Sequence, residues 1–367
     1  MDIPRIQRLI AAIKKYNCDA LLISDSINLF YLTGLQLSTA ELLICDRRVA
    51  LIVDGRYFEV AQRCREVDVY LSEKMPLDLL LKEPGYAAIS KLGFDEENTS
   101  YRRFLQLSQL LTKHNKNTGA SIALQPVANP VKELRAIKEE DEIAILRRSA
   151  ALCSAGFDFV SALLCEGVSE EALAAQLEIF WKQRGANGIA FTPIIAFGAN
   201  SSMPHHQSGT TRLTSGDTVL IDIGVKWQQY HSDMTRIVFF QRPSPRLVEV
   251  HRVVEKAQRA ALQACKPGVV VGELDAIARR VIAEAGYGEQ FTHSLGHGVG
   301  LEVHELPTLR NKMADSARRL EVGMVITIEP GIYLPGVGGV RLEDCVVLRP
   351  DGYENLTNRP TAPSCIP

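Results

Sequence analysis

The sequence predicts an α/β domain followed by a larger α+β domain. Its 367 residues are enough for two domains, each with its own core. Helical and β-rich patterns alternate in the first third of the chain, whereas glycine-punctuated apolar strands dominate the second half. Between them, Pro126 and Pro130 bracket three residues that a helix cannot cross. We therefore assign residues 1–127 to the first domain and residues 128–367 to the second.

The first domain is predicted to pack helices on a mixed sheet. The opening MDIPRIQRLIAAIKKY forms an amphipathic helix, with Ile6, Leu9, Ile10 and Ile13 on one face. Strands are expected at Asp19–Ser24, Glu41–Cys45, Val49–Val53, Val67–Leu71 and Lys91–Phe94, and helices at Tyr57–Arg65 and Tyr101–Leu111. No cluster of catalytic residue types falls in this part of the sequence, so we interpret the domain as structural or oligomerising.

The second domain is predicted to lay helices over one face of a largely antiparallel sheet. A charged helix is expected from Lys132 to about Leu164, and its acidic run at 139–142 is interpreted as a solvated face. Ser169 is expected to cap the helix that follows it. The other helices are expected at Glu170–Arg184, Pro245–Cys265 and Gly272–Ala285, and strands at Ile194–Phe197, Thr218–Val225, Asp233–Phe240, Met324–Glu329 and Val340–Leu348.

The composition excludes several classes of partner. A net charge of −2 provides no global field toward nucleic acid or an anionic membrane. No apolar run is long enough to cross a bilayer, and the charged N-terminus does not resemble a signal peptide. The eight cysteines form no CxxC pair, which favours reduced, buried thiols over a disulfide framework. We therefore expect a cytoplasmic protein.

Five acidic and imidazole side chains occur in an order that suggests a metal site. They are Asp222 in IDIG, Asp233 in HSDMTR, His297 in SLGHGVG, Glu329 in TIEPG and Glu343 in VRLED. One imidazole and four carboxylates are enough to hold two divalent cations, and this oxygen-rich set suits Mn²⁺, Co²⁺ or Zn²⁺. A pair of such ions can activate water for attack on a carbonyl.

The first two aspartates are predicted to face each other across a hairpin that turns at Trp227-Gln228. Direct opposition would place Asp222 and Asp233 with their Cβ atoms roughly 5 Å apart, which is unfavourable unless a cation lies between them. The residues around Asp222 are apolar, and an unpaired carboxylate is costly to bury there. The alternative is a surface hairpin whose polar face carries both aspartates by chance.

The two glutamates repeat this arrangement on a second predicted hairpin. Glu329 ends an apolar strand before Pro330, and Glu343 lies in the β run after the flexible stretch 335–339. Arg341 is two residues from Glu343 and so shares its face, which leaves a structural ion pair as an alternative role for Arg341.

His297 is the imidazole with the strongest case for a ligand, because Gly296, Gly298 and Gly300 surround it. We interpret these glycines as allowing the backbone to approach a ligand closely. A phosphate-binding loop is the alternative, but neither GxGxxG nor GK[ST] is present in the sequence.

Taken together, these motifs resemble a known family. DIG, SDMTR eleven residues later, HSLGHGVGLEVHELP, IEPGIY and RLED are similar to the motifs of metallopeptidase family M24, which includes Xaa-Pro aminopeptidases, prolidases and methionine aminopeptidases. The resemblance extends from about Val131 to the end and implies the α+β pita-bread fold. The first domain is similar to the α/β N-terminal domain of prolidases, aminopeptidases P and creatinases.

The resemblance implies a role for each ligand candidate. Asp222 would bind one cation, Asp233 and Glu343 would bridge two, and His297 and Glu329 would complete the second site. Glu329 would also transfer a proton from water to the leaving nitrogen.

The resemblance further implies a set of residues around the substrate. His304 would hydrogen-bond the scissile carbonyl, and His205 would occupy another histidine position of the family, with the adjacent His206 as a second candidate. His293 would line a proline pocket, while Arg341 and Tyr333 would orient ligands and substrate.

We therefore expect a dinuclear metallo-exopeptidase, an Xaa-Pro aminopeptidase, that acts on peptides with proline at the second position. It would use two divalent ions per chain, Mn²⁺ in the first place and otherwise Co²⁺ or Zn²⁺, and the resemblance implies a homodimer. An Xaa-Pro dipeptidase (prolidase) is the alternative. Dipeptidases often carry an arginine just past HExP, where this chain has Thr308 and Leu309 before Arg310. A non-catalytic or metal-free, creatinase-like member of the fold is the remaining alternative.

Overall fold

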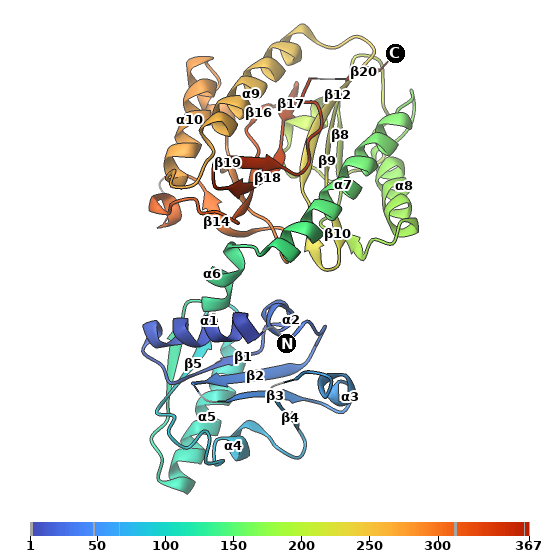
Figure 1. The fold of residues 1–367 in the computed structure, drawn as a ribbon. Helices are drawn as coiled ribbons and strands as arrows, with labels where there is room; N and C mark the ends of the chain where they lie inside the picture. The colour runs from blue at the N-terminus through green and yellow to red at the C-terminus, as the bar shows by residue number, and fades with distance from the viewer. Residues whose placement is uncertain (1–2, 47, 66, 312–313, 363, 367) are drawn as a thin grey trace. The chain divides into compact units, whose positions relative to one another are not determined.

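The computed structural model describes residues 3–46, 48–65, 67–311, 314–362 and 364–366 (Figure 1). The chain divides into two compact units, Met1–Arg135 and Ala136–Pro367, while the boundary at 127/128 stays a prediction. The cysteines are free, but Cys165 and Cys365 are exposed rather than buried. Within the described ranges, no helix has both the length and the apolar character needed to span a membrane.

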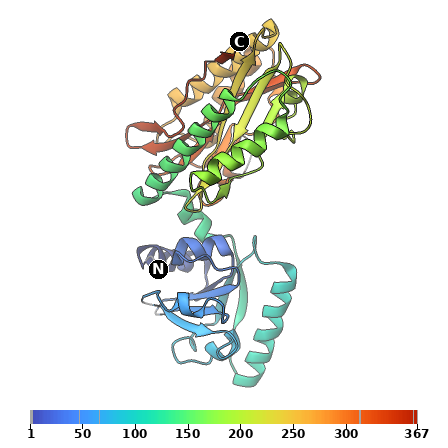
Figure 2. The same cartoon turned by 90° about the vertical axis from the view of Figure 1, so that its right-hand side faces the viewer.

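The first unit is built on a six-stranded mixed sheet with the order β4-β3-β2-β1-β5-β6. Its strands are β1 (Ala20–Ile23), β2 (Ala40–Cys45), β3 (Val49–Val53), β4 (Asp68–Leu71), β5 (Lys91–Asp95) and β6 (Ala123–Val127). Its helices are α1 (Ile3–Ile13), α2 (Ser26–Thr33), α3 (Phe58–Ala61), α4 (Leu77–Leu80) and α5 (Tyr101–Thr118). Consecutive residues such as Leu21 and Leu22 are both buried, because α1 and α5 lie on opposite faces of the sheet (Figures 1 and 2).

The predicted α/β class of this unit is confirmed, with differences at its periphery. The helix expected at Tyr57–Arg65 is limited to Phe58–Ala61, and α2 and β6 were not predicted. Pro126 lies within β6, which is tolerated because β6 is an edge strand.

The second unit contains two larger sheets, with the orders β20-β12-β9-β8 and β14-β13-β15-β18-β19, and two small sheets, β11-β10-β7 and β16-β17. The strands are β7 (Gly188–Ile189), β8 (Ile194–Phe197), β9 (Thr218–Ile223), β10 (Val225–Trp227), β11 (Tyr230–His231), β12 (Met234–Phe240), β13 (Gly296–Gly298), β14 (Glu305–Leu309), β15 (Val325–Ile328), β16 (Gly331–Leu334), β17 (Gly338–Arg341), β18 (Asp344–Arg349), β19 (Gly352–Asn355) and β20 (Ser364–Ile366). The α-helices are α6 (Pro130–Ala136), which spans the division between the units, α7 (Glu140–Ala162), α8 (Glu170–Gln183), α9 (Pro245–Ala264) and α10 (Val271–Glu284).

Strand β9 shows how the helices sandwich the β-structure. Leu220 packs in a core with α9 and α10, whereas Val219 and Ile221 pack in a second core with α7 and α8. Figures 1 and 2 show these two helix pairs on opposite sides of the strands. Side chains alternate along a strand, so Asp222 shares the face of Leu220. That face also packs against β15 to β18, which brings Asp222 toward the second large sheet.

The single helix expected from Lys132 to Leu164 is wrong, because α6 and α7 are separated by a short extended connection. Ile137 forms a bridge with Met324, and Lys138 N donates a hydrogen bond to Gly323 O. The side chain of Glu139 then accepts from the N3 backbone N–H of α7, and the side chain of Glu142 accepts from the backbone N–H of Glu139.

The interpretation of the acidic run as a solvated face is wrong for Glu142. This residue is buried, and its carboxylate accepts a hydrogen bond from the Tyr230 hydroxyl at 2.8 Å. Tertiary contacts, rather than helix propensity, thus decide where α7 begins.

The register of the first hairpin differs from the predicted one. Gln228 and Gln229 adopt positive φ values of 47° and 71° and form the turn, so Asp222 pairs with Thr235 instead of Asp233. The partner residue shifts by two positions, which is one full side-chain repeat. Both aspartates therefore remain on one face, as diagonal neighbours.

Candidate metal centre

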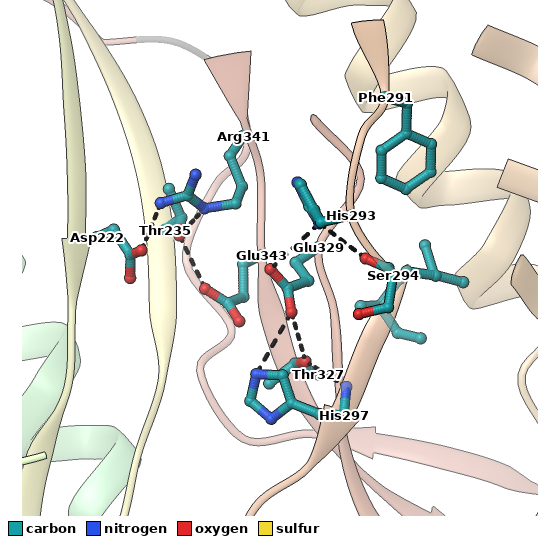
Figure 3. A network of polar contacts seen from close by, with 12 residues as sticks. Asp222, Thr235, Phe291, His293, Ser294, His297, Thr327, Glu329, Arg341 and Glu343 are labelled. Atoms are coloured by element: carbon teal, nitrogen blue, oxygen red, sulfur yellow. Dashed lines mark hydrogen bonds and ion pairs between the residues drawn. The ribbon is translucent and has the colours of Figure 1, made fainter. Parts of the chain in front are cut away.

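The five predicted ligand residues come from five separate stretches of the second unit and converge where its two large sheets meet. Asp222 lies on β9, and Asp233 directly precedes β12. His297 lies on β13, and Glu329 directly follows β15. Glu343 stands between β17 and β18. Figure 3 shows Asp222, Glu343, Glu329 and His297 with their polar groups directed toward one another.

Three of these residues are close enough to hold one cation. One ligand atom each of Asp233, His297 and Glu343 lies within 4.8 Å of the other two. His297 Nε2 is 3.7 Å from Asp233 Oδ2 and 3.3 Å from Glu329 Oε1. Bonds from such ligands to a divalent cation are about 2 Å long, so small adjustments would bring these atoms around an ion.

The two glutamates are directly opposed on the second hairpin. Ile328 pairs with Asp344 and Gly331 pairs with Arg341, and this register places Glu329 opposite Glu343. Glu343 N also donates to Thr235 O at 3.1 Å, which joins the second hairpin to the first. The predicted pairing of carboxylates across a hairpin thus holds for the glutamates.

The carboxylates repel one another, and burial adds to the cost of their charge. Burial and then Glu343 raise the pKa of both Asp233 and Glu329 well above the ordinary range. Burial and then Asp222 raise the pKa of Glu343 to about 8. Burial and then His304 lower the pKa of His297 to about 3, so this imidazole is neutral near pH 7. A site with this excess of buried anionic groups favours cations.

An unsatisfied oxygen is the strongest structural sign that a ligand is needed. Asp222 Oδ2 accepts a hydrogen bond from Arg341, but Oδ1 is buried and has no hydrogen-bond partner among the described residues. Leaving such an oxygen without a donor is costly, and a cation would satisfy it. The donor set therefore fits divalent metal ions.

His297 is oriented as a metal ligand would be. Its Nδ1 lies 3.0 Å from Gly298 O, which fixes the proton there and leaves the Nε2 lone pair facing the carboxylates. The glycines around His297 make room for other parts of the protein, because Gly296 and Gly298 face backbone and Gly300 faces the Glu305 carboxylate. A Cβ atom on Gly298 would lie 2.1 Å from Leu306 O, and one on Gly296 would lie 2.0 Å from Thr327 O.

Arg341 and two threonines hold the carboxylates in place (Figure 3). Arg341 forms an ion pair with Asp222 rather than with Glu343, and its Nε donates to Thr235 Oγ1 at 3.1 Å. The Thr235 hydroxyl donates to Glu343 Oε2 at 2.8 Å. Neither threonine was predicted. Thr235 is two residues from Asp233, and Thr327, whose hydroxyl lies 3.3 Å from Glu329 Oε1, is two residues from Glu329, so strand periodicity could have indicated both.

An aromatic wall lies beside Glu329. His293 Nε2 is 2.9 Å from the Tyr333 hydroxyl. The same hydroxyl accepts a hydrogen bond from Arg341 at 2.7 Å. The ring of Phe291 meets His293 edge-on, with centroids 5.1 Å apart. Burial and then Arg341 lower the pKa of His293 to about 4, so its ring is neutral. The structure thus brings the predicted His293 and Tyr333 together and adds Phe291.

The remaining predicted histidines have different surroundings. His304 is exposed, and its ring lies 4.2 Å from that of His297. Burial of the imidazole nitrogens and then His205 lower the pKa of His304, which shows that His205 is within electrostatic reach. His206 instead contacts the buried carboxylate of Glu170 at 2.8 Å. Of the adjacent His205 and His206, only His205 is therefore grouped with the residues of the candidate metal centre.

Comparison with known proteins identifies the family. The sequence profile of metallopeptidase family M24 matches residues 144–350, and that of the Creatinase/Prolidase N-terminal domain matches residues 5–137. The chain belongs to metallopeptidase family M24. Its α/β first unit and α+β second unit are the Creatinase N-terminal domain and the M24 catalytic domain, which confirms the predicted fold class.

Among M24 relatives, an uncharacterized peptidase of Staphylococcus aureus is 35% identical, and the match covers 96% of this chain and 99% of the relative. An Xaa-Pro dipeptidase from Bacillus anthracis superposes with a TM-score of 0.91 at 33% identity, covering 99% of both chains. An X-Pro aminopeptidase from Thermotoga maritima superposes with a TM-score of 0.87 at 33% identity, covering 99% of this chain and 100% of the other. The neighbours of this M24 chain thus include both exopeptidase types.

Proposed function

We propose that this M24 metallopeptidase is an Xaa-Pro aminopeptidase, which removes the residue before a proline from peptides longer than two residues. The observation that carries the proposal is the convergence of four carboxylates and one neutral imidazole beside an aromatic wall. Asp222, Asp233 and Glu343, with His297 and Glu329, would hold two divalent cations, Mn²⁺ in the first place. When bound, such ions lower the pKa of water and polarise a carbonyl.

The chain's own groups would manage the protons of the reaction. Glu329 Oε2 lies 4.0 Å from His293 Nδ1, so the Glu329 carboxylate lies between the other candidate metal ligands and the aromatic wall. From there Glu329 would accept a proton from water and deliver it to the departing prolyl nitrogen. The nitrogen of a prolyl amide is tertiary and leaves only when it gains a proton, which makes this transfer necessary.

His304 and His205 would bind the scissile carbonyl. A neutral imidazole N–H donates a hydrogen bond, and the lowered pKa of His304 keeps that ring neutral near pH 7. His293, Tyr333 and Phe291 would form the slot for the proline ring, since a flat apolar wall fits a five-membered ring without an N–H. His206 is not part of the proposed substrate site, because its Nε2 contacts Glu170.

The preference for longer peptides is supported by two arginines near the site that are already paired. Arg341 is committed to Asp222 and Tyr333, and Arg279 forms an ion pair with Asp275 at 2.8 Å. Arg310 is exposed just beyond the end of β14. A dipeptidase needs a cationic side chain to bind the free carboxylate of its substrate. An enzyme that cleaves longer peptides has no such need, because the carboxylate of a longer substrate lies further from the scissile bond.

An Xaa-Pro dipeptidase is the second candidate, supported by the similarity to the Bacillus anthracis protein of that name. The test compares an Xaa-Pro dipeptide, an Xaa-Pro-Xaa tripeptide and an Xaa-Ala-Xaa control, each with Mn²⁺-loaded protein. We expect cleavage of the tripeptide and little of the other two. Exclusive cleavage of the dipeptide would establish the second candidate, and no cleavage of either proline peptide would contradict both. A homodimer and a cytoplasmic location are further parts of the proposal.

A further inference from the structure

A fully buried carboxylate outside the metal centre organises the loop that carries His205. Glu170 is the first residue of α8, and its side chain has no exposed surface. Its Oε1 accepts hydrogen bonds from Phe197 N at 2.8 Å and from the side-chain amide of Asn200 at 2.9 Å. These two contacts fix the start of the loop, where β8 ends and a short 3₁₀ helix, Gly198–Ser202, begins.

The second oxygen of Glu170 fixes the other end of the same loop. Oε2 accepts a hydrogen bond from Gly209 N at 3.0 Å and lies 2.8 Å from His206 Nε2. His206 is the immediate neighbour of His205, and His206 N donates a hydrogen bond to Met203 O at 3.1 Å, which closes a turn that contains His205. Anchoring His206 on Glu170 therefore holds this turn in place, while His205 itself is exposed.

The loop is also tied directly to the hairpin that carries Arg341. Ser201 Oγ accepts a hydrogen bond from Gly339 N at 2.8 Å, and Gly339 lies on β17 two residues before Arg341. The loop thus has a fixed position relative to the metal centre, and His205 acts electrostatically on His293 and His304. A buried carboxylate stabilises a fold less than a well-packed apolar group would, so the value of Glu170 lies in the specific arrangement that it enforces.

We propose that Glu170 is a positioning residue, which acts through His206 and the loop amides to set where His205 meets the substrate. The inference rests on the proposed function, because it requires His205 to contact a peptide. It adds a residue that no sequence motif indicated. The sequence marks Glu170 only as the start of a helix.

The test uses full-length protein loaded with Mn²⁺ and an Xaa-Pro-Xaa peptide. Glu170→Gln keeps the size of the side chain but replaces one acceptor oxygen with an amide, which cannot accept from both ends of the loop. Displacing a catalytic group by about 1 Å can reduce turnover about 100-fold, so we expect kcat to fall by 10- to 100-fold with a smaller change in KM. Glu171→Gln removes the same charge from the exposed neighbouring residue and serves as the matched control.

Repeating the measurement in a second variant protein separates a positioning role of Glu170 from a merely structural one. If Glu170 acts through His205, then Glu170→Gln should reduce kcat less than twofold in a protein that already carries His205→Asn. Equal losses in both backgrounds would overturn the inference. Should Glu170→Gln fail to fold, His206→Gln removes one of the four contacts and is measured in the same two backgrounds, with the same criterion.

Failure of this inference is distinguishable from failure of the proposed function. If wild-type protein cleaves the peptide and Glu170→Gln is equally active, the positioning role alone is wrong. If wild-type protein cleaves no proline peptide, hydrogen–deuterium exchange of residues 198–209 provides the test. Faster exchange in Glu170→Gln but not in Glu171→Gln would support control of the loop, and unchanged exchange would overturn it.

Discussion

Removal of the cations should make the stability of this protein fall as pH rises. Burial and Asp222 raise the pKa of Glu343 from its ordinary 4.5 to about 8. A carboxyl group with a raised folded-state pKa is more protonated in the folded chain than in the unfolded chain. Its stabilising contribution is complete below pH 4.5 and is lost progressively as pH rises toward 8. The raised pKa values of Asp233 and Glu329 act in the same direction.

The size of the effect follows from the two pKa values of Glu343. Each pH unit between them removes about 1.4 kcal/mol, and the slope flattens near pH 8. Between pH 6.5 and 8.5, Glu343 alone should therefore cost the metal-free protein roughly 2 kcal/mol. For a domain of this size, that corresponds to about 4–8 °C in Tm. Bound cations should abolish the loss, because they stabilise the ionised carboxylates.

The assay is thermal unfolding of chelator-treated protein at pH 6.5 and 8.5, with and without added Mn²⁺. Glu343→Gln is the comparison, because it removes the titrating group while the histidines contribute similarly in both proteins. We expect a smaller pH dependence in metal-free Glu343→Gln than in metal-free wild type, and no turnover from the variant. The reasoning is refuted if metal-free wild type is as stable at pH 8.5 as at pH 6.5, or if both proteins show the same dependence.

Three further outcomes are expected. Glu329→Gln should lower kcat about 10²- to 10⁴-fold through loss of proton transfer, with cation content measured by elemental analysis to separate that loss from lost metal. Lys138→Met removes the ammonium group 3.1 Å from buried Glu305 and should cost about 3–5 kcal/mol in denaturant unfolding, a loss that a second change, Glu305→Met, should largely restore. Gly298→Ala forces a Cβ against a backbone oxygen of β14 and should cost about 1–3 kcal/mol and weaken cation binding, whereas Gly188→Ala, which has open space, should do neither. Equal unfolding free energies for the two alanine variants would contradict the packing argument.

Local patterns were sufficient for most of the fold. The apolar runs at β1, β3, β8 and β9 were recognisable because strands buried on both faces lack polar interruptions. Ser169 was recognisable as a cap because its hydroxyl accepts from Ala172 N, a contact within one helical turn. The break before α7 was not recognisable, because it depends on Gly323 and Met324, which are nearly two hundred residues away in sequence.

The candidate site also contains some features that local sequence patterns predict and others that they do not. Asp222 and Asp233 kept a common face despite the wrong register, since a shift of two positions preserves side-chain parity. The turn itself could not be predicted, because Gln228 and Gln229 carry no turn signal and adopt positive φ only in this hairpin. His206 and His205 are adjacent and chemically identical, and only the buried Glu170 distinguishes them.

The sequence by itself determined which residues can bind cations, because ligand chemistry and strand periodicity are local properties. The tertiary structure alone decided which glycines fit against backbone, which carboxylate Arg341 pairs with, and which histidine turns away from the substrate side. These choices depend on segments that are distant in sequence and meet only when the two large sheets pack together, so no local pattern can encode them.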